Sequence, residues 1–432
     1  MGTPSYPPSA ARAWRWVPTL YFCEGIPYVV AMTVSVILYK NLGVSNTAVA
    51  FYTSWLYLPW VIKPLWSPVV DLIRTKRAWI VSLQLGLGAA LALIAAAVPG
   101  PHFLRLTLAA FWLLAFSSAT HDIAADGFYL LALPPHDQAA FVGVRSTFYR
   151  VAMIAGQGGL VYLAGSLQST LGAPARAWSA VFLLLAGAFV LAGIYHLFVL
   201  PRPAADRAPA RAARPVAEFF SVFASFFRKP GIATILGFLL LYRLAEAQLL
   251  KLVAPFLLDA RARGGLGLTT QQVGFIYGTI GLVALLLGGL AGGYAVARFG
   301  LKRLLWPMLI SMQLPLAVFV VLAVRQPTSA AWIGGALTVE QFGYGFGFTA
   351  YMVYMMLVAD GEHRTAHYAI CTGFMALGMM LPGLPAGWIE DRVGYVWFFL
   401  WVCLATVPSF VATALVRIPP DYGRRAASAP AD

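Results

Sequence analysis

The stretch Ser117-Ser118-Ala119-Thr120-His121-Asp122-Ile123-Ala124-Ala125-Asp126 lies inside a long apolar segment, Leu104 to Leu133, whose length and composition predict a membrane helix. Asp122 and Asp126 are four residues apart, so a helix places both carboxylates on one face. A charge at membrane depth is costly, and such groups face a cavity or a partner and usually carry function. The alternative is that the two aspartates form gating or structural ion pairs near the cytoplasmic end. Both interpretations require a polytopic membrane protein.

The composition assigns the chain to the same class. Of its 432 residues, 60% are hydrophobic and 11% are charged, and the mean hydropathy is +0.76, whereas a soluble domain carries about 25% charged residues. The net charge of +14 does not indicate nucleic-acid binding, because the basic residues fall in short loops between apolar runs. The three cysteines lie within apolar segments, so we expect no disulfide framework. The first apolar run is interpreted as a retained helix and not as a signal peptide.

Apolar segments of about 20 residues, the length that spans hydrocarbon, predict an all-α membrane protein with twelve transmembrane helices. The first six lie at 16–38, 48–70, 78–98, 104–132, 142–166 and 177–199. The second six lie at 232–258, 272–297, 304–324, 331–358, 366–389 and 396–417. Residues 201–230 form a long hydrophilic connection, which predicts a cytoplasmic linker between an N-terminal bundle (1–200) and a C-terminal bundle (231–432).

The distribution of basic residues predicts the orientation of these helices. With the N-terminus inside, 19 of the 30 Lys and Arg residues fall in cytoplasmic segments and 7 in outer loops. Cytoplasmic loops carry an excess of Lys and Arg, so both termini are expected in the cytoplasm.

The two halves of the chain echo one another. Trp66 to Arg77, between the second and third predicted helices, carries an acidic residue and several basic ones, and Gly292 to Arg303 occupies the corresponding place in the second half. Likewise the fourth predicted helix ends in Asp126-Gly127 and the tenth in Asp360-Gly361. Repeats in corresponding positions are typical of secondary transporters.

Asp71 followed by basic residues in the loop after the second helix resembles the signature of the major facilitator superfamily. The resemblance implies two six-helix bundles around a central cavity. It also implies a cytoplasmic latch in this loop, with Asp71, Arg74 and Arg77 as gating residues.

Four stretches narrow the resemblance: Glu24-Gly25-Ile26-Pro27, Lys63-Pro64-Leu65-Trp66-Ser67-Pro68, His121-Asp122-Ile123-Ala124-Ala125-Asp126-Gly127 and Tyr242-Arg243-Leu244-Ala245-Glu246. Together they resemble the AmpG muropeptide permeases and the related acetyl-coenzyme A transporters. This resemblance implies proton-coupled import across a bacterial inner membrane by alternating access. The implied substrates are muropeptides or a similar anionic amphiphile, such as a sugar-peptide or a coenzyme A derivative.

Proton coupling needs a carboxylate that gains and loses a proton at cellular pH, as a buried carboxylate can. Asp122 and Asp126 are the first candidates, and Glu24 lies in the first predicted helix. His121 is a candidate relay because imidazole titrates near neutrality. A hydrogen-bonded histidine that packs helices together is the alternative.

An anionic substrate needs cationic partners, for which Arg150 and Arg243 are the first candidates because a guanidinium holds a carboxylate or phosphate through two hydrogen bonds. In the competing interpretation Arg150 pairs with Asp122 or Asp126, and Arg243 pairs with Glu246, as internal neutralisation. The candidate substrate-binding set is Arg150, Arg243, Glu246 and Lys63. Lys63 is also placed to extend toward the interface.

In Gln341-Phe342-Gly343-Tyr344-Gly345-Phe346-Gly347 the glycines alternate with aromatic residues. Aromatic side chains in a cavity can stack on a sugar or an adenine ring, whereas the alternative is that they face lipid or pack helices. The two interpretations stay open at the level of sequence.

Several chemistries lack their motifs. The chain has no phosphate loop, no HExxH or CxxC metal pattern and no G-x-S-x-G elbow. These absences favour a transporter over an enzyme, and the resemblance implies a small-molecule substrate and protons as partners. We also expect a monomer in the lipid bilayer, with no cofactor, metal or nucleic acid. The alternatives are a drug or siderophore efflux transporter of the same fold, and a non-transporting membrane receptor or intramembrane enzyme.

Overall fold

The computed structural model describes residues 12–204, 206, 215–361 and 364–424. Within these ranges, side chains are not described at 68–69, 71–72, 135–136, 139–140, 215–219, 222 and 365. Every regular element in the described part of the chain is a helix. Contacts divide the chain into two compact units: residues Met1–Gly43 with Ile62–Pro215, and residues Val44–Val61 with Val216–Asp432. Each unit is therefore described by itself.

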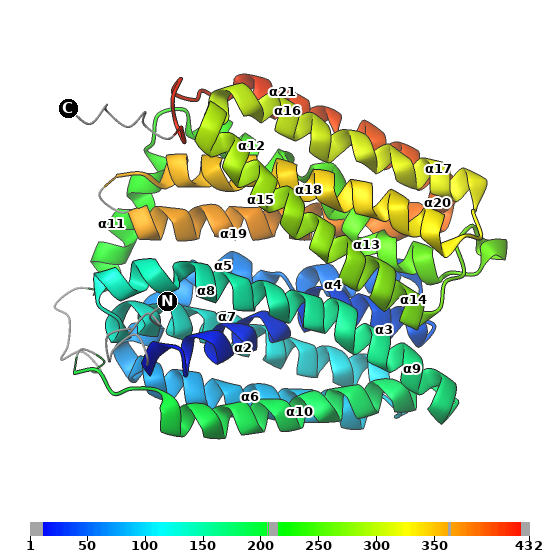
Figure 1. Cartoon of the computed structure of the whole chain (residues 1–432), viewed down its shortest axis with the longest axis horizontal. Helices are drawn as coiled ribbons and strands as arrows, with labels where there is room; N and C mark the ends of the chain where they lie inside the picture. The colour runs from blue at the N-terminus through cyan, green and yellow to red at the C-terminus, as the bar shows by residue number, and fades with distance from the viewer. Residues whose placement is uncertain (1–11, 205, 207–214, 362–363, 425–432) are drawn as a thin grey trace, which may run out of the picture. The chain divides into compact units, whose positions relative to one another are not determined.

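The first unit is built from long helices (Figure 1), and a π-helical turn interrupts the helical path in two places within its described residues. Its elements are α2 (Val17–Val29), η1 (Val30–Val34), α3 (Ser35–Asn41), α5 (Leu58–Ile73, from Ile62 on), α6 (Lys76–Ala97), α7 (Phe103–Ala132), α8 (Pro135–Ile154), η2 (Ala155–Leu160), α9 (Val161–Leu171) and α10 (Pro174–Val199). Helix α2 packs against α7 and α8, and α6 packs against α7 and α10. The proton-coupling and substrate-binding candidates of this unit lie on α2, α5, α7 and α8.

The second unit has a similar make-up and also contains α4 (Asn46–Trp55). Its other elements are α11 (Pro215–Phe227), α12 (Ile232–Leu241), α13 (Leu244–Leu258), η3 (Arg261–Arg263), α14 (Thr270–Phe275), η4 (Ile276–Gly281), α15 (Leu282–Phe299), α16 (Leu301–Gln313), η5 (Leu314–Leu316), α17 (Ala317–Arg325), α18 (Ala330–Ala359), α19 (Arg364–Gly383), α20 (Ala386–Leu404) and α21 (Val407–Leu415). Helix α20 bends at Gly394, whose φ of 76° no helical residue adopts.

The helices agree with the predicted spans. Among the described residues, nine helices are long and apolar enough to cross a membrane. Three further helical stretches, at 46–73, 135–171 and 364–383, coincide with the remaining predicted spans. Side-chain caps mark several helix starts, because a helix leaves its first backbone N–H groups without partners. The Thr75 hydroxyl, for example, accepts from the Ala78 N–H at the start of α6.

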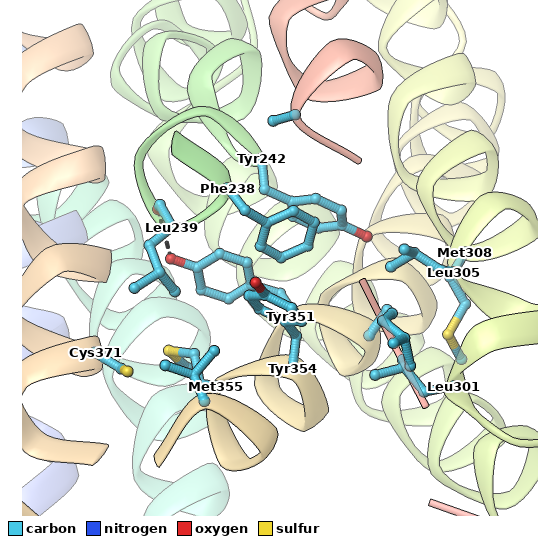
Figure 2. Close-up of a cluster of buried hydrophobic side chains, with 14 of the residues drawn as sticks. Phe238, Leu239, Tyr242, Leu301, Leu305, Met308, Tyr351, Tyr354, Met355 and Cys371 are labelled. Carbon is cyan, nitrogen blue, oxygen red and sulfur yellow. Dashed lines mark hydrogen bonds between the residues drawn. The ribbon is translucent and has the colours of Figure 1, made fainter. Parts of the chain in front are cut away.

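The core of the second unit is aromatic (Figure 2). Phe238 of α12 packs against Tyr351 and Tyr354 of α18, and Tyr242, at the C-terminal boundary of α12, packs against Tyr351. The ring centroids of these pairs are 4.3 to 5.9 Å apart. Two of the buried phenols donate to backbone: the Tyr351 hydroxyl to the Leu239 carbonyl at 2.7 Å, and the Tyr242 hydroxyl to the Gly347 carbonyl at 3.0 Å. These bonds remove the cost of burying a polar group and join the two helices.

The segment predicted as a hydrophilic linker is only partly irregular. Residues 215–227 form helix α11, and Phe226 is fully buried against Phe374 of α19. Ser225 Oγ also lies 2.9 Å from His367 Nε2. The sequence gives the physical reason. From Pro215 on, the segment is rich in phenylalanine, and burying these side chains against an apolar surface is favourable.

The alternating glycines of α18 pack helices together. A β-carbon at Gly345 would lie 2.0 Å from the Leu285 carbonyl oxygen of α15, and one at Gly343 would lie 2.1 Å from the Ser311 carbonyl oxygen of α16. Helix α18 contacts both α15 and α16 (Figure 1). Because such close approach requires residues without side chains, this stretch serves packing, and two of its aromatic neighbours, Tyr344 and Phe348, hold Arg243.

Candidate functional site

Helix α7 presents Asp122 and Asp126 on one face, and each carboxylate has its own cation. The Lys63 ammonium of α5 donates to Asp122 Oδ2. The Arg145 guanidinium of α8 donates to Asp126 Oδ1 at 2.7 Å. The side chains of Asp122 and Asp126 are 21% and 44% exposed, so both ion pairs are only partly buried. The competing interpretation that paired Arg150 with these carboxylates does not describe the structure.

Glu24 of α2 adds a third carboxyl group to this site. It is buried, and its carboxyl group lies within hydrogen-bonding reach of Asp122. Its Oε2 atom has no hydrogen-bond partner among the described residues. Two carboxyl groups can form such a contact only when one of them carries a proton. We call Glu24, Asp122 and Asp126, together with Lys63 and Arg145, the carboxylate cluster.

Tyrosines orient the arginine of the cluster. The Arg145 guanidinium carbon lies 4.5 Å from the centre of the Tyr21 ring and 5.2 Å from that of Tyr129. The Tyr21 hydroxyl also donates to Asp126 Oδ1 at 3.2 Å. A cation held over aromatic faces and against a carboxylate has few other rotamers open to it.

The local sequence explains how α2 reaches α8. A β-carbon at Gly25 would lie 2.8 Å from Ala152 Cβ and 2.9 Å from the Tyr149 carbonyl oxygen of α8. Glycine at this position permits the two helices to touch, and it sets the depth of its neighbour Glu24. The close helix contact at Gly25 thus positions the carboxyl group of the neighbouring Glu24.

His121 lies in a separate polar chain. Its Nε2 is 3.1 Å from Gln84 Nε2, Gln84 Oε1 is 2.8 Å from His196 Nδ1, and His196 Nε2 is 2.9 Å from Thr19 Oγ1. This chain ties α7, α6 and α10 together through buried groups and reaches α2 at the exposed Thr19. Among the described residues, no hydrogen bond joins this polar chain to the carboxylate cluster, so His121 occupies a helix-packing position.

In the second unit Arg243 and Glu246 form a tight pair. Arg243 Nε and Nη2 donate to the two Glu246 carboxylate oxygens at 3.1 and 3.0 Å. Nη2 also donates to the Tyr344 hydroxyl at 2.6 Å, and the guanidinium lies 4.6 Å from the centre of the Phe348 ring. The pair is almost fully buried. Arg150, by contrast, is exposed on α8.

The structure describes the side chains of two of the three predicted gating residues, Arg74 and Arg77. Arg77 of α6 donates to the Leu197 and Leu200 carbonyls at the end of α10, a favourable place for a cation because helix C-termini carry partial negative charge. The Asp206 carboxylate accepts the backbone N–H groups of Lys76 and Arg77 at 2.7 and 3.0 Å. Arg74 is exposed. Asp71 lies in α5, and its side chain is outside the described residues.

The sequence did not assign Arg145, Tyr21 or Lys251 to a site. Tyr21 stands three residues before Glu24, a spacing that places both on one helix face. Lys251 lies in the middle of the apolar helix α13, and an ionisable residue in such a place is a functional candidate by default. Within the described residues, no group of three or more His, Cys, Asp or Glu side chains is arranged to hold a metal ion. The chemistry that the cluster supports is exchange of a proton and of ion-pair partners.

Comparisons with known proteins show which family the chain belongs to. Residues 19–381 match the Major Facilitator Superfamily. The chain is 26% identical over 417 residues to the anhydromuropeptide permease of Escherichia coli (strain K12), an alignment that covers 94% of this chain and 80% of that protein. It is 24% identical to putative transporter AmpG 4 of Rickettsia conorii (strain ATCC VR-613 / Malish 7), over 89% of this chain and 92% of that protein.

A solved structure shares the fold. The crystal structure of the nucleoside transporter NupG (D323A mutant) superposes with a TM-score of 0.69 at 16% identity, over 95% of this chain and 100% of that one. At this identity the likeness concerns the fold alone. The all-helical architecture, the spans and the family match over most of the chain agree: this multi-pass membrane protein belongs to the major facilitator superfamily, is related to the anhydromuropeptide permeases, and is a secondary transporter and not an enzyme.

Proposed function

We propose that the chain is a proton-coupled importer of muropeptides, or of a similar anionic amphiphile, and that the carboxylate cluster is its proton site. The observation that carries the proposal is the Lys63–Asp122 ion pair with the Glu24 carboxyl group beside it. It places a cation that can bind an anion next to carboxyl groups that can bind a proton.

The charges of the cluster support this role. Three carboxyl groups (Glu24, Asp122 and Asp126) face two cations (Lys63 and Arg145). With every carboxyl ionised, one negative charge would lack a partner at membrane depth, which is costly. One bound proton makes the cluster neutral, and the Glu24–Asp122 contact is a place for it.

Coupling follows from competition for Lys63. A proton on Asp122 removes the charge that holds the Lys63 ammonium, and the ammonium can then bind an anionic group of the substrate. When the proton leaves, Asp122 recovers Lys63 and the anionic group is displaced. Proton and anion therefore bind together and leave together, which is the requirement for symport. Alternating access between the two bundles, residues 1–200 and 231–432, would carry both across the membrane.

The relatives support the substrate class. The protein of Escherichia coli that matches 94% of this chain is named an anhydromuropeptide permease. We carry this substrate over as part of the proposal, together with a bacterial inner-membrane location and cytoplasmic termini. Monomeric function belongs to the same proposal.

Uptake into proteoliposomes tests the proposal. Under an imposed inward proton gradient, the wild-type protein should accumulate labelled anhydromuropeptide, and Asp122→Asn should reduce accumulation to the level of empty liposomes because the site can no longer release a proton. Downhill exchange should be largely retained. Asp421→Asn, at a side chain that is 80% exposed, is the matched control and should behave as wild type.

Each contrary outcome has a distinct meaning. Unchanged accumulation by Asp122→Asn would refute Asp122 as the coupling residue. Extrusion driven by the gradient would instead identify an efflux transporter, and transport that ignores the gradient would exclude proton coupling.

A further inference from the structure

Lys251 is a buried lysine with no carboxylate partner among its described neighbours. It lies in α13 and is 3% exposed. Its ammonium donates to Thr53 Oγ1 at 3.1 Å and lies 5.0 Å from the centre of the Tyr57 ring. An ammonium has three donors. One hydroxyl and one ring face leave its charge only partly compensated.

Three other cations on the membrane-spanning helices have carboxylate partners. Lys63, Arg145 and Arg243 each pair with a carboxylate. In the described part of the chain, no carboxylate oxygen comes within 4 Å of the Lys251 ammonium. A buried charge without a partner is strongly destabilising, as is the charge left behind when one member of a buried ion pair is removed. Such a group is therefore a functional candidate and not a packing element.

A second polar group beside Lys251 also lacks a partner. Ser54 Oγ of α4 is fully buried and has no hydrogen-bond partner among the described residues. Gly383, at the end of α19, brings the two together: a β-carbon there would lie 2.7 Å from Ser54 Oγ and 3.2 Å from Lys251 Cγ. Thr53, Ser54, Tyr57 and Lys251 all belong to the second unit, so their arrangement is set within one compact body.

We propose that Lys251, with Thr53 and Ser54, binds a carboxylate group of the transported solute. A carboxylate has about four lone-pair sites. It can accept from the ammonium and from the Ser54 hydroxyl, and so satisfies both groups. Tyr57 contributes the aromatic wall on which the lysine rests. The inference rests on the proposed transport function and adds to it a carboxylate subsite in the second unit, separate from the carboxylate cluster of the first.

Ligand-induced thermal stabilisation of the purified full-length protein in detergent tests the subsite without transport. The probes are anhydromuropeptide, a tripeptide with a free C-terminal carboxylate and succinate, each compared with its fully amidated form. We expect at least one carboxylate probe to stabilise the wild type more than its amide does. Lys251→Met should weaken binding of that probe by roughly tenfold to a hundredfold, the range of one charge-assisted hydrogen bond. Lys302→Met, at an exposed lysine of the same unit, is the control and should leave binding unchanged.

A second readout guards against misfolding. Without ligand, Lys251→Met should unfold at a temperature equal to or higher than wild type, because it removes an unpaired buried charge. Ser54→Ala should weaken the same probe less than Lys251→Met does. Equal binding of carboxylate and amide by the wild type, or unchanged binding by Lys251→Met, would overturn the inference, and so would a lower unfolding temperature for Lys251→Met. Failure of wild-type muropeptide uptake would instead reject the proposed substrate, because succinate and the tripeptide report on the subsite separately.

Discussion

Two ion pairs of similar chemistry differ in how far they are open to exchange. The side chains of Asp122 and Lys63 are each about a fifth to a quarter exposed, and the Glu24 carboxyl group lies beside Asp122 as an alternative partner. Arg243 and Glu246 are buried, bidentate and further held by Tyr344. A partly exposed ion pair with an alternative partner is suited to exchanging partners repeatedly. A buried ion pair with two parallel hydrogen bonds is suited to a structural role.

This difference yields a prediction at the residue scale. Arg243→Met leaves Glu246, which is 1% exposed, as an uncompensated buried charge, and should lower the free energy of unfolding by roughly 3–5 kcal/mol. Arg243→Met/Glu246→Met removes both charges and should recover most of that loss. Thermal unfolding of the purified protein measures both. Arg424→Met, in an exposed pair, should change stability by about 0–1 kcal/mol.

The same variants decide between the two roles of Arg243. If the folded double variant transports as wild type does, Arg243 serves internal neutralisation. If it folds but loses substrate affinity, Arg243 binds substrate. Equal instability of the single and double variants would contradict the account of the buried pair given above.

At the element scale, α18 shows how glycine spacing sets helix packing. One face of the helix meets α15 and another meets α16, with glycines at the points of contact. Because the backbones touch there, an added methyl group has no room. Such a group would have to displace an entire helix. Aromatic residues next to these glycines extend toward other neighbours, which is how Tyr344 and Phe348 reach Arg243.

Two identical substitutions in this helix should differ sharply. Gly345→Ala would place a β-carbon 2.0 Å from the Leu285 carbonyl oxygen, and we expect a loss of about 1–3 kcal/mol, typical of overpacking. Gly335→Ala meets no atom within 4 Å and should be neutral, or stabilising by about 1 kcal/mol at most. Unfolding temperatures of the two variants, measured side by side, check this. Equal values would show that the contact between α15 and α18 is not tight.

At the scale of the whole molecule, the contact-defined units differ from the two halves of the chain. The boundary at Pro215 falls inside the predicted linker, but Val44–Val61 groups with the second unit. This segment caps its own start through Ser45 and packs against α13, α19 and α20. Asn46, for instance, donates to the Glu390 carboxylate at 2.6 Å and to the Tyr395 hydroxyl at 2.9 Å. Helix α4 is thus held by polar contacts that its own apolar pattern does not indicate.

The proposed orientation is testable by cysteine labelling. Arg263→Cys lies between the seventh and eighth spans and should react with a membrane-impermeant maleimide in intact spheroplasts. Lys302→Cys lies between the eighth and ninth spans and should react only after permeabilisation. The wild type is the background control, since Cys23 and Cys371 are buried and Cys403 is partly so. The opposite labelling pattern would place the termini outside.

Much of the fold could be predicted because it depends on local composition. Apolar length predicted where helices run, and α6, α10 and α18 lie where the apolar segments indicated. Helix α11 was missed within the predicted linker because its 13 residues are too few to span a bilayer, although its phenylalanines are visible in the sequence after Pro215. The π-helical turns in the first, fifth and eighth spans also left no signal in the apolar pattern.

The candidate site divides along the same line. By itself the sequence determined that Asp122 and Asp126 share a helix face and that Arg243 can reach Glu246, because helical periodicity is a property of neighbouring residues. Only the tertiary structure decided that Lys63 meets Asp122, that Arg145 meets Asp126 and that Lys251 meets no carboxylate in the described residues. Those partners come from other helices, and which helices touch depends on how their surfaces fit, with glycines such as Gly25 at the points of closest approach.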